Sequence, residues 1–161
     1  MQEFKGTLQD EIQQVQPFRS RSQEAVLGIL RTADLLRRVI SKIVEPWGIT
    51  HQQYNVMRIL RGAGDEGIPT LTIAQRMVER TPGITRLIDR LESKGWVERT
   101  RCPDDRRQVV CRISRMGLEL LDELDGPIDA FDDTGLAMLD LDDQENLIEL
   151  LDRVREGLRS T

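Results

Sequence analysis

Aromatic residues, cysteine and histidine are scarce in this chain of 161 residues: Phe, Trp and Tyr together make up 4%, with two cysteines and one histidine. Two cysteines are too few for a disulfide-stapled secreted scaffold. The single histidine, His51, excludes most zinc sites and His-based catalytic triads, so we expect neither a metal nor another cofactor. No apolar run approaches the roughly 20 residues of a membrane helix, and residues 1–5 lack a signal-peptide hydrophobic region. We therefore expect a reduced, cytoplasmic protein that has no membrane partner.

The net charge of −5 hides an uneven distribution along the chain. Residues 1–67 carry nine basic and eight acidic side chains, residues 68–115 carry eleven and six, and residues 116–161 carry three and fourteen. A basic centre beside an acidic C-terminal segment indicates a polyanionic partner for the centre. The local charge decides this point because salt screens charges beyond about 10 Å.

Hydrophobic periodicity predicts a mainly α-helical chain. After a polar N-terminal arm, apolar residues recur at helical spacing over 22–45, and Pro46 ends that helix. Capping boxes at 50–53 and 142–145 each predict the start of a helix, and Ser114 predicts a third start. Gly126-Pro127 should break or kink the helix that follows Ser114. Residues 96–101 and 109–113 alternate as two strands of a hairpin.

Between these elements lie two short helices, and the second has the features of a DNA-recognition helix. Thr81 is a good N-cap and Pro82 suits the first helical position. Apolar residues at i, i+3, i+4 and i+7 form the inner face, namely Ile84, Leu87, Ile88 and Leu91. The outer face and start of the helix offer a small residue, hydroxyls and cations for contact with duplex DNA: Thr81, Pro82, Gly83, Thr85, Arg86, Asp89 and Arg90.

The tip of the predicted hairpin is basic. Arg106 and Arg107 are expected to lie along the DNA backbone or to enter a narrow minor groove, where the negative potential is concentrated. Asp105 is acidic at this tip, and we interpret it as a hydrogen-bond partner that fixes the guanidinium of Arg107. An amphipathic helix with outward arginines is by itself usually a solvated surface helix. The ordered combination of close helices, glycine stop, strand, basic turn and strand is more specific.

The run from Leu71 to Arg99, followed by Asp105-Arg106-Arg107 and by Ile113-Ser114-Arg115-Met116-Gly117, resembles the winged helix-turn-helix of the MarR (multiple antibiotic resistance regulator) family. The resemblance implies a mainly α fold with a small β-hairpin wing, in which N- and C-terminal helices form a dimerisation lobe. It implies a homodimer on a pseudo-palindromic double-stranded DNA operator, acting as a repressor that a small ligand or oxidation releases. The chain would then divide into a flexible or weakly helical arm (residues 1–20), a dimerisation helix (21–46), the DNA-binding domain (50–115) and C-terminal dimerisation helices (116–161).

Two further groups of residues are candidates for sensing. Trp47, His51 and Tyr54 lie near the junction of the first two long helices, where the resemblance implies a ligand cleft, and an aromatic acid or phenol would suit them. The alternative is that Trp47 and Tyr54 are core residues and that His51 belongs to the capping box. Cys102 and Cys111 could face each other across the hairpin and oxidise, or could remain two reduced cysteines.

Other classes of function have less support in the sequence. We find no phosphate loop, nucleophile elbow or paired metal motif, so we do not expect an enzyme. A helical module that binds another protein through its hairpin is the remaining alternative to a DNA-binding regulator. The apolar stripes of the first and last helices favour a symmetric dimer, although both helices could instead pack within one chain.

Overall fold

The computed structural model describes residues 6–101 and 109–160, which divide into two compact units, Met1–His51 and Gln52–Thr161. The first unit contains a short helix α1 (Leu8–Glu11), the long helix α2 (Arg21–Val44) and a 3₁₀ turn, η1 (Glu45–Trp47). A capping box between Thr7 and Asp10 starts α1, and Glu11 accepts a hydrogen bond from Arg31 of α2 at 2.8 Å. The weakly helical arm expected before residue 21 therefore has a short helix that is tied to α2.

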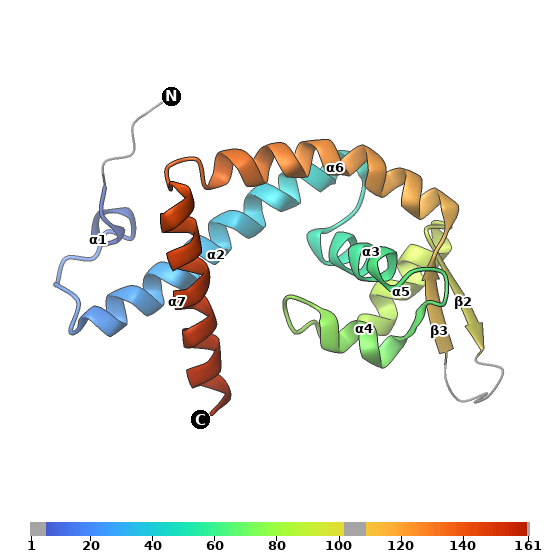
Figure 1. The fold of residues 1–161 in the computed structure, drawn as a ribbon, viewed down its shortest axis with the longest axis horizontal. Helices are drawn as coiled ribbons and strands as arrows, with labels where there is room; N and C mark the ends of the chain where they lie inside the picture. Colours follow the sequence, from blue (N-terminus) through green and yellow to red (C-terminus); the bar gives the residue numbers. More distant parts are fainter. Residues whose placement is uncertain (1–5, 102–108, 161) are drawn as a thin grey trace. The chain divides into compact units, whose positions relative to one another are not determined.

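The second unit contains the remaining elements (Figure 1). These are α3 (His51–Ala63), β1 (Ile68–Pro69), α4 (Thr70–Arg76), α5 (Ile84–Ser93), β2 (Val97–Arg101), β3 (Val109–Ile113), α6 (Arg115–Gly135) and α7 (Leu141–Arg159). The strands form an antiparallel sheet in the order β1-β3-β2, with Val97 opposite Ile113 and Arg101 opposite Val109. The predicted mainly helical fold with a β-hairpin is confirmed, and β1 is an additional strand that pairs with β3.

The core of the second unit is built from helix faces that pack around the sheet. Met57 and Leu60 of α3, Ile73 of α4, Ile88 of α5 and Leu121 of α6 are fully buried. Burial of each such side chain stabilises the folded state by roughly 1.5–3 kcal/mol relative to leaving it exposed to water. In α4, Ile73 occupies the core position, whereas Leu71 is 70% exposed.

Two predicted helix boundaries are wrong. Helix α7 begins at Leu141 rather than after Asp142, because the Asp140 side chain is the N-cap and accepts from the backbone N–H of Asp143 at 2.8 Å. Helix α6 is continuous through Pro127, so the chain does not break there. Proline removes one backbone donor from a helix, and the burial of Leu124 and Ile128 on either side favours continuation. The second wrong boundary, at the start of α5, affects the candidate site.

Within the described residues no helix has the length and hydropathy needed to cross a membrane.

Candidate nucleic-acid interface

Helices α4 and α5 are joined by residues 77–83, and this connection is held from α3. The side chain of Asn55 accepts a hydrogen bond from the backbone N–H of Val78 at 3.1 Å. The hydroxyl of Thr81 donates to the carbonyl of Glu79 at 3.1 Å. These two bonds fix both halves of the connection, and sequence reasoning missed Asn55 because a polar residue inside a helix carries no local signal for a contact 23 residues away.

The start of α5 differs from the prediction. The helix begins at Ile84, and Gly83 is the N-cap with a φ of 82°, a left-handed conformation that favours glycine. Thr81 is therefore not the N-cap and Pro82 is not the first helical residue. Both lie in the turn before the helix, and the threonine hydroxyl serves that turn instead.

The two faces of α5 are those that the spacing predicts. Leu87, Ile88 and Leu91 are buried, while Thr85, Arg86 and Arg90 on the opposite side are exposed. Arg86 and Arg90 are one turn apart and line a surface hollow of about 480 Å³ together with Gln52, Thr81, Pro82, Gly83 and Leu87. Gln52, at the start of α3, is a residue of this surface that the sequence did not indicate.

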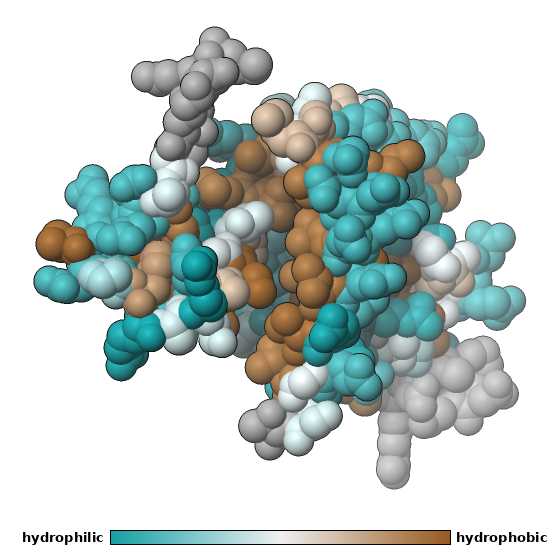
Figure 2. Space-filling model, turned by 60° about the vertical axis from the view of Figure 1, so that its left-hand side comes forward, coloured by the Kyte–Doolittle hydropathy of each residue, from teal (hydrophilic) through white to brown (hydrophobic). Residues whose placement is uncertain are grey.

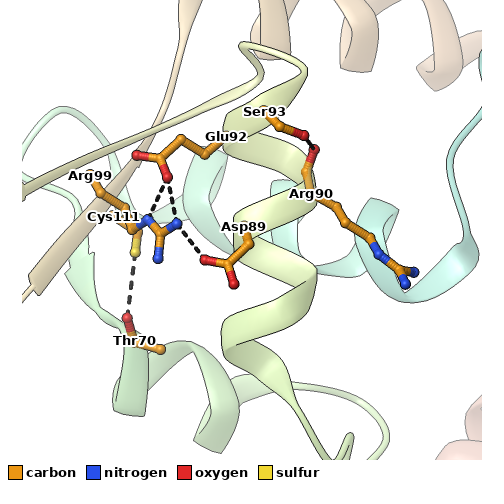
Figure 3. Close-up of polar contacts among 7 residues, drawn as sticks. All are labelled: Thr70, Asp89, Arg90, Glu92, Ser93, Arg99 and Cys111. Atoms are coloured by element: carbon orange, nitrogen blue, oxygen red, sulfur yellow. Dashed lines mark hydrogen bonds and ion pairs between the residues drawn. The ribbon is translucent and has the colours of Figure 1, made fainter.

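Asp89, expected to face DNA, makes an ion pair within the protein. Arg99 of β2 donates to the Asp89 carboxylate at 2.5 Å and, through Nε, to Glu92 at 2.9 Å (Figure 3). A second nitrogen of the same guanidinium also contacts Glu92. Arg90 points to the other side of α5, away from this cluster (Figure 3). The hydrogen bond that Arg99 donates to Glu92, together with the charges of the two carboxylates, raises the pKa of Arg99, so its charge is permanent. We refer to Arg99, Asp89 and Glu92 as the Arg99 clamp.

The clamp joins the two parts of the candidate interface. Arg99 lies in β2, the strand that leads into the hairpin, and both carboxylates lie on α5. The fork of an arginine fixes direction as well as distance, because its N–H donors are rigidly arranged. The orientation of β2 relative to α5 is therefore determined by side chains that do not face the exposed arginines of α5.

The hairpin tip itself lies outside the described residues, and this includes Cys102, Asp105, Arg106 and Arg107. The strand register nevertheless tests one prediction. Cys111 is paired with Arg99 across the ladder, so the expected cross-strand pairing of Cys111 with Cys102 is wrong. Cys111 is fully buried with its sulfur 3.6 Å from the Thr70 hydroxyl, and burial raises the pKa of its thiol. A buried neutral thiol is a poor nucleophile, which weakens the redox hypothesis.

The three candidate ligand residues occupy different environments. Trp47 ends η1 and is partly exposed, and the Nδ1 atom of His51 lies 3.4 Å from the Ser41 hydroxyl in the same unit. Tyr54 belongs to the other unit, is 5% exposed, and carries the Arg58 guanidinium 5.8 Å from its ring centroid. Burial raises the pKa of the Tyr54 hydroxyl. These contacts fit the core alternative for Tyr54, and a ligand role for the three residues stays a prediction.

Known proteins with the same arrangement share the family that the sequence resembles. A model of the MarR family matches residues 49–109. The crystal structure of a MarR transcription factor from Planctomyces limnophilus is 40% identical, and the match covers 84% of this chain and 98% of that one with a TM-score of 0.65. This chain belongs to the MarR family.

Other MarR-family proteins are more distant. The regulator FarR of Neisseria gonorrhoeae is 26% identical over 70% of this chain and 76% of its own. The multiple antibiotic resistance protein MarR of Salmonella typhimurium is 29% identical over 53% of this chain, and the match spans 58% of that protein's length. The MepR–DNA complex of S. aureus shares the fold, with a TM-score of 0.75 at 18% identity over 86% of this chain and 99% of that one. FarR is a transcriptional regulator by name, and the fold of this chain is the winged helix-turn-helix of the MarR-family structures.

Proposed function

We propose that this MarR-family protein is a homodimeric repressor that binds a pseudo-palindromic double-stranded DNA operator in the cytoplasm and is released by a small effector. The observation that carries the proposal is the exposed, cationic face of α5. Arg86 and Arg90 stand on the side of the helix opposite its buried leucines, next to a turn held by Asn55. A helix of this width fits the major groove, and arginine can bridge O6 and N7 of guanine. MepR, which shares the fold, was crystallised with DNA.

The charge distribution supports the same surface. Residues 68–115 carry a net charge of +5, whereas residues 116–161 carry −11. Phosphates would attract the first segment and repel the second, which orients the protein on a duplex. In this proposal residues 50–115 bind DNA, with Arg106 and Arg107 on the wing reaching the flanking minor groove.

Dimerisation is supported by apolar side chains that a single chain leaves exposed. Helix α7 has no buried residue within the described part of the chain. Its apolar side chains include four that are each at least 54% exposed, namely Leu141, Ile148, Leu150 and Leu158. In α2, Val26 is 55% and Leu30 is 61% exposed. Apolar side chains reach the molecular surface in the space-filling view (Figure 2). Faces of this kind mark interaction sites, and we propose that residues 21–46 and 116–161 pair with their counterparts in a second copy.

The effector would be a small organic molecule. PcaV of Streptomyces coelicolor was crystallised with its natural ligand. This chain shares the fold of PcaV with a TM-score of 0.72 at 20% identity, over 89% of this chain and 99% of that one. Trp47, His51 and Tyr54 are the residues that we propose for an aromatic acid or phenol here. Titration of such compounds against the protein–operator complex measures whether any of them releases DNA.

Arginine substitutions test the DNA-binding proposal. The probe is a duplex that the wild-type protein selects from random DNA, together with single-base variants of it. Arg86→Ala should lower discrimination at one base pair in each half-site by about 1–3 kcal/mol, because a base contact is lost. Arg107→Ala should weaken binding to all sequences, because a phosphate contact is lost. The slope of log K against log salt concentration should become shallower by about one.

The matched control is Arg153→Ala, which removes an exposed cation from α7. It should leave affinity, discrimination and salt dependence unchanged. Binding that is independent of salt, and equal for all duplexes, would favour the alternative of a helical module that binds protein.

A further inference from the structure

The N-terminus of helix α6 is anchored to residues 95–96, which lie between α5 and β2. The Ser114 hydroxyl donates to the carbonyl of Gly95 at 2.6 Å and accepts from the backbone N–H of Gly117 at 3.1 Å. The backbone N–H of Ser114 donates to the carbonyl of Trp96 at 3.0 Å. These bonds fix the point at which α6 begins. Beyond it, Leu120, Leu121, Leu124 and Ile128 pack one face of the helix into the core, and apolar packing is non-directional.

A second anchor holds α6 near its middle. Both terminal nitrogens of Arg61, in the last turn of α3, donate to the two oxygens of Asp125, at 2.8 and 2.9 Å. Asp122, one turn earlier, lies 3.8 Å from the same guanidinium. The bidentate pair joins residues 64 positions apart in the sequence, and it adds a directional contact to the apolar packing of α6.

Beyond this second anchor α6 continues as an unbroken rod. The helix extends to Gly135, ten residues past Asp125, which corresponds to roughly 15 Å at 1.5 Å per residue. The last buried side chain of α6 is Ile128, and α7 follows after the turn at 136–140. A small rotation of α6 at the second anchor therefore becomes a larger displacement at the C-terminal end of α6 and at the start of α7.

The ion pair is poorly placed to act mainly on stability. The Arg61 and Asp125 side chains are 33% and 40% exposed, and ion pairs with that much solvent typically contribute only about 0–1 kcal/mol. Two parallel hydrogen bonds do, however, define a direction. The arrangement thus fits a role in geometry better than a role in holding the fold together.

We propose that Arg61 is a positioning residue: its ion pair with Asp125 sets the direction of α6 and thereby the spacing of the two DNA half-sites that a dimer can read. The inference rests on the proposed function, because α6 and α7 connect the α5 helices of two chains only in a dimer. A change in the direction of α6 moves the two copies of α5 relative to each other. Half-site spacing on B-DNA is a geometric constraint of about 34–36 Å per helical turn, so such movement is detectable.

The test measures binding to a series of duplexes that differ only in spacing. The selected operator is lengthened or shortened by one and two base pairs at its symmetry centre, and Kd is measured for each duplex. The wild-type protein should lose at least about tenfold in affinity for a two-base-pair insertion, which separates the half-sites by roughly 7 Å. Arg61→Met and Asp125→Asn should each reduce that loss to about threefold or less.

Three further arms complete the experiment. The double variant should show the same broadened profile as either single variant, because both remove one pair. Glu119→Gln, which removes the exposed pair with Arg115 in the first turn of α6, should keep the wild-type profile. Asp125→Asn preserves side-chain shape, so it remains informative if Arg61→Met fails to fold.

The outcomes separate the two levels of the proposal. A variant that binds more weakly at every spacing, with the wild-type ratio between spacings unchanged, has lost only stability or affinity and overturns the positioning role of Arg61. Additive broadening in the double variant overturns it as well. A wild-type protein that binds all spacings equally overturns the dimeric two-half-site function itself, and the inference with it.

Discussion

At Gly117, helix α6 lies close to the backbone of Trp96, the residue before β2. A Cβ atom built there would lie 2.3 Å from the carbonyl oxygen of Trp96 and 2.7 Å from a side-chain carbon of Ile113. The first of these neighbours is backbone and cannot rotate away. Glycine is thus required for the close approach that lets Ser114 and Gly95 hydrogen-bond at the start of α6.

Gly117→Ala should consequently destabilise the protein by about 1–3 kcal/mol, because overpacking outweighs the higher helix propensity of alanine. Gly62→Ala in α3 is the matched control, since nothing lies within 4 Å of the Cβ position there. That control should be neutral or stabilising by up to about 1 kcal/mol. Urea denaturation of both variants measures the difference, and equal stability of Gly117→Ala and wild type would contradict the contact.

At the residue scale the sequence predicted which side of α5 is buried but not what each polar residue does. The spacing of Leu87, Ile88 and Leu91 was sufficient for the buried side, because helical periodicity depends only on local geometry. Asp89 belongs to the same helix, and its position on the outer face predicts a contact with DNA. Its partner Arg99 lies ten residues along the chain in another element, and only the tertiary structure brings the two together.

At the element scale the Arg99 clamp makes α5 and β2 one structural piece. The two elements are the ones predicted to enter the major groove and to lead to the wing. If they are held at a fixed angle, DNA can engage both without reordering the protein, which reduces the entropic cost of binding.

A double-mutant cycle tests whether Asp89 acts through the clamp. Asp89→Asn should weaken operator binding by about 0.5–1.5 kcal/mol in the wild-type protein and by almost nothing in the Arg99→Ala protein, because the interaction is already absent there. The measurement is Kd for the four proteins on one duplex. Glu98→Gln, a neutralised exposed acid on the same strand, serves as the control and should bind as wild type.

A full effect of Asp89→Asn in the Arg99→Ala background would instead place Asp89 in contact with DNA. That result would restore the role predicted from the sequence and contradict the role inferred from the ion pair.

Elements were predictable where the signal is local, and less so where several residues compete for one role. Both strands of the hairpin and the long helices follow from periodicity. The predicted start of α7 is misplaced because Asp140, Asp142 and Asp143 can all cap a helix, and the residue that caps it is Asp140, which accepts from the backbone N–H of Asp143. The strand β1 has two residues and contains Pro69, so it has no pattern of its own and exists only through pairing with β3.

At the scale of the whole molecule, the charge distribution and the exposed apolar faces support the proposed dimer on DNA. The segment with a net charge of −11 contains α7, whose apolar side chains are exposed within the described residues. Charge asymmetry could be counted in the sequence. The exposure of α7 could not be predicted from the sequence, because the spacing of its leucines is the same whether they pack within the chain or against a second copy.

The most direct test of the account is the stoichiometry and salt dependence of its complex with DNA. Sedimentation of the full chain with the selected duplex should give a free dimer and a complex of two chains per duplex. Affinity should fall by at least about a hundredfold between roughly 50 and 200 mM salt, because several phosphates are neutralised on binding. A protein that sediments as a single chain, and that leaves the duplex unbound at the lower salt concentration, would contradict the account.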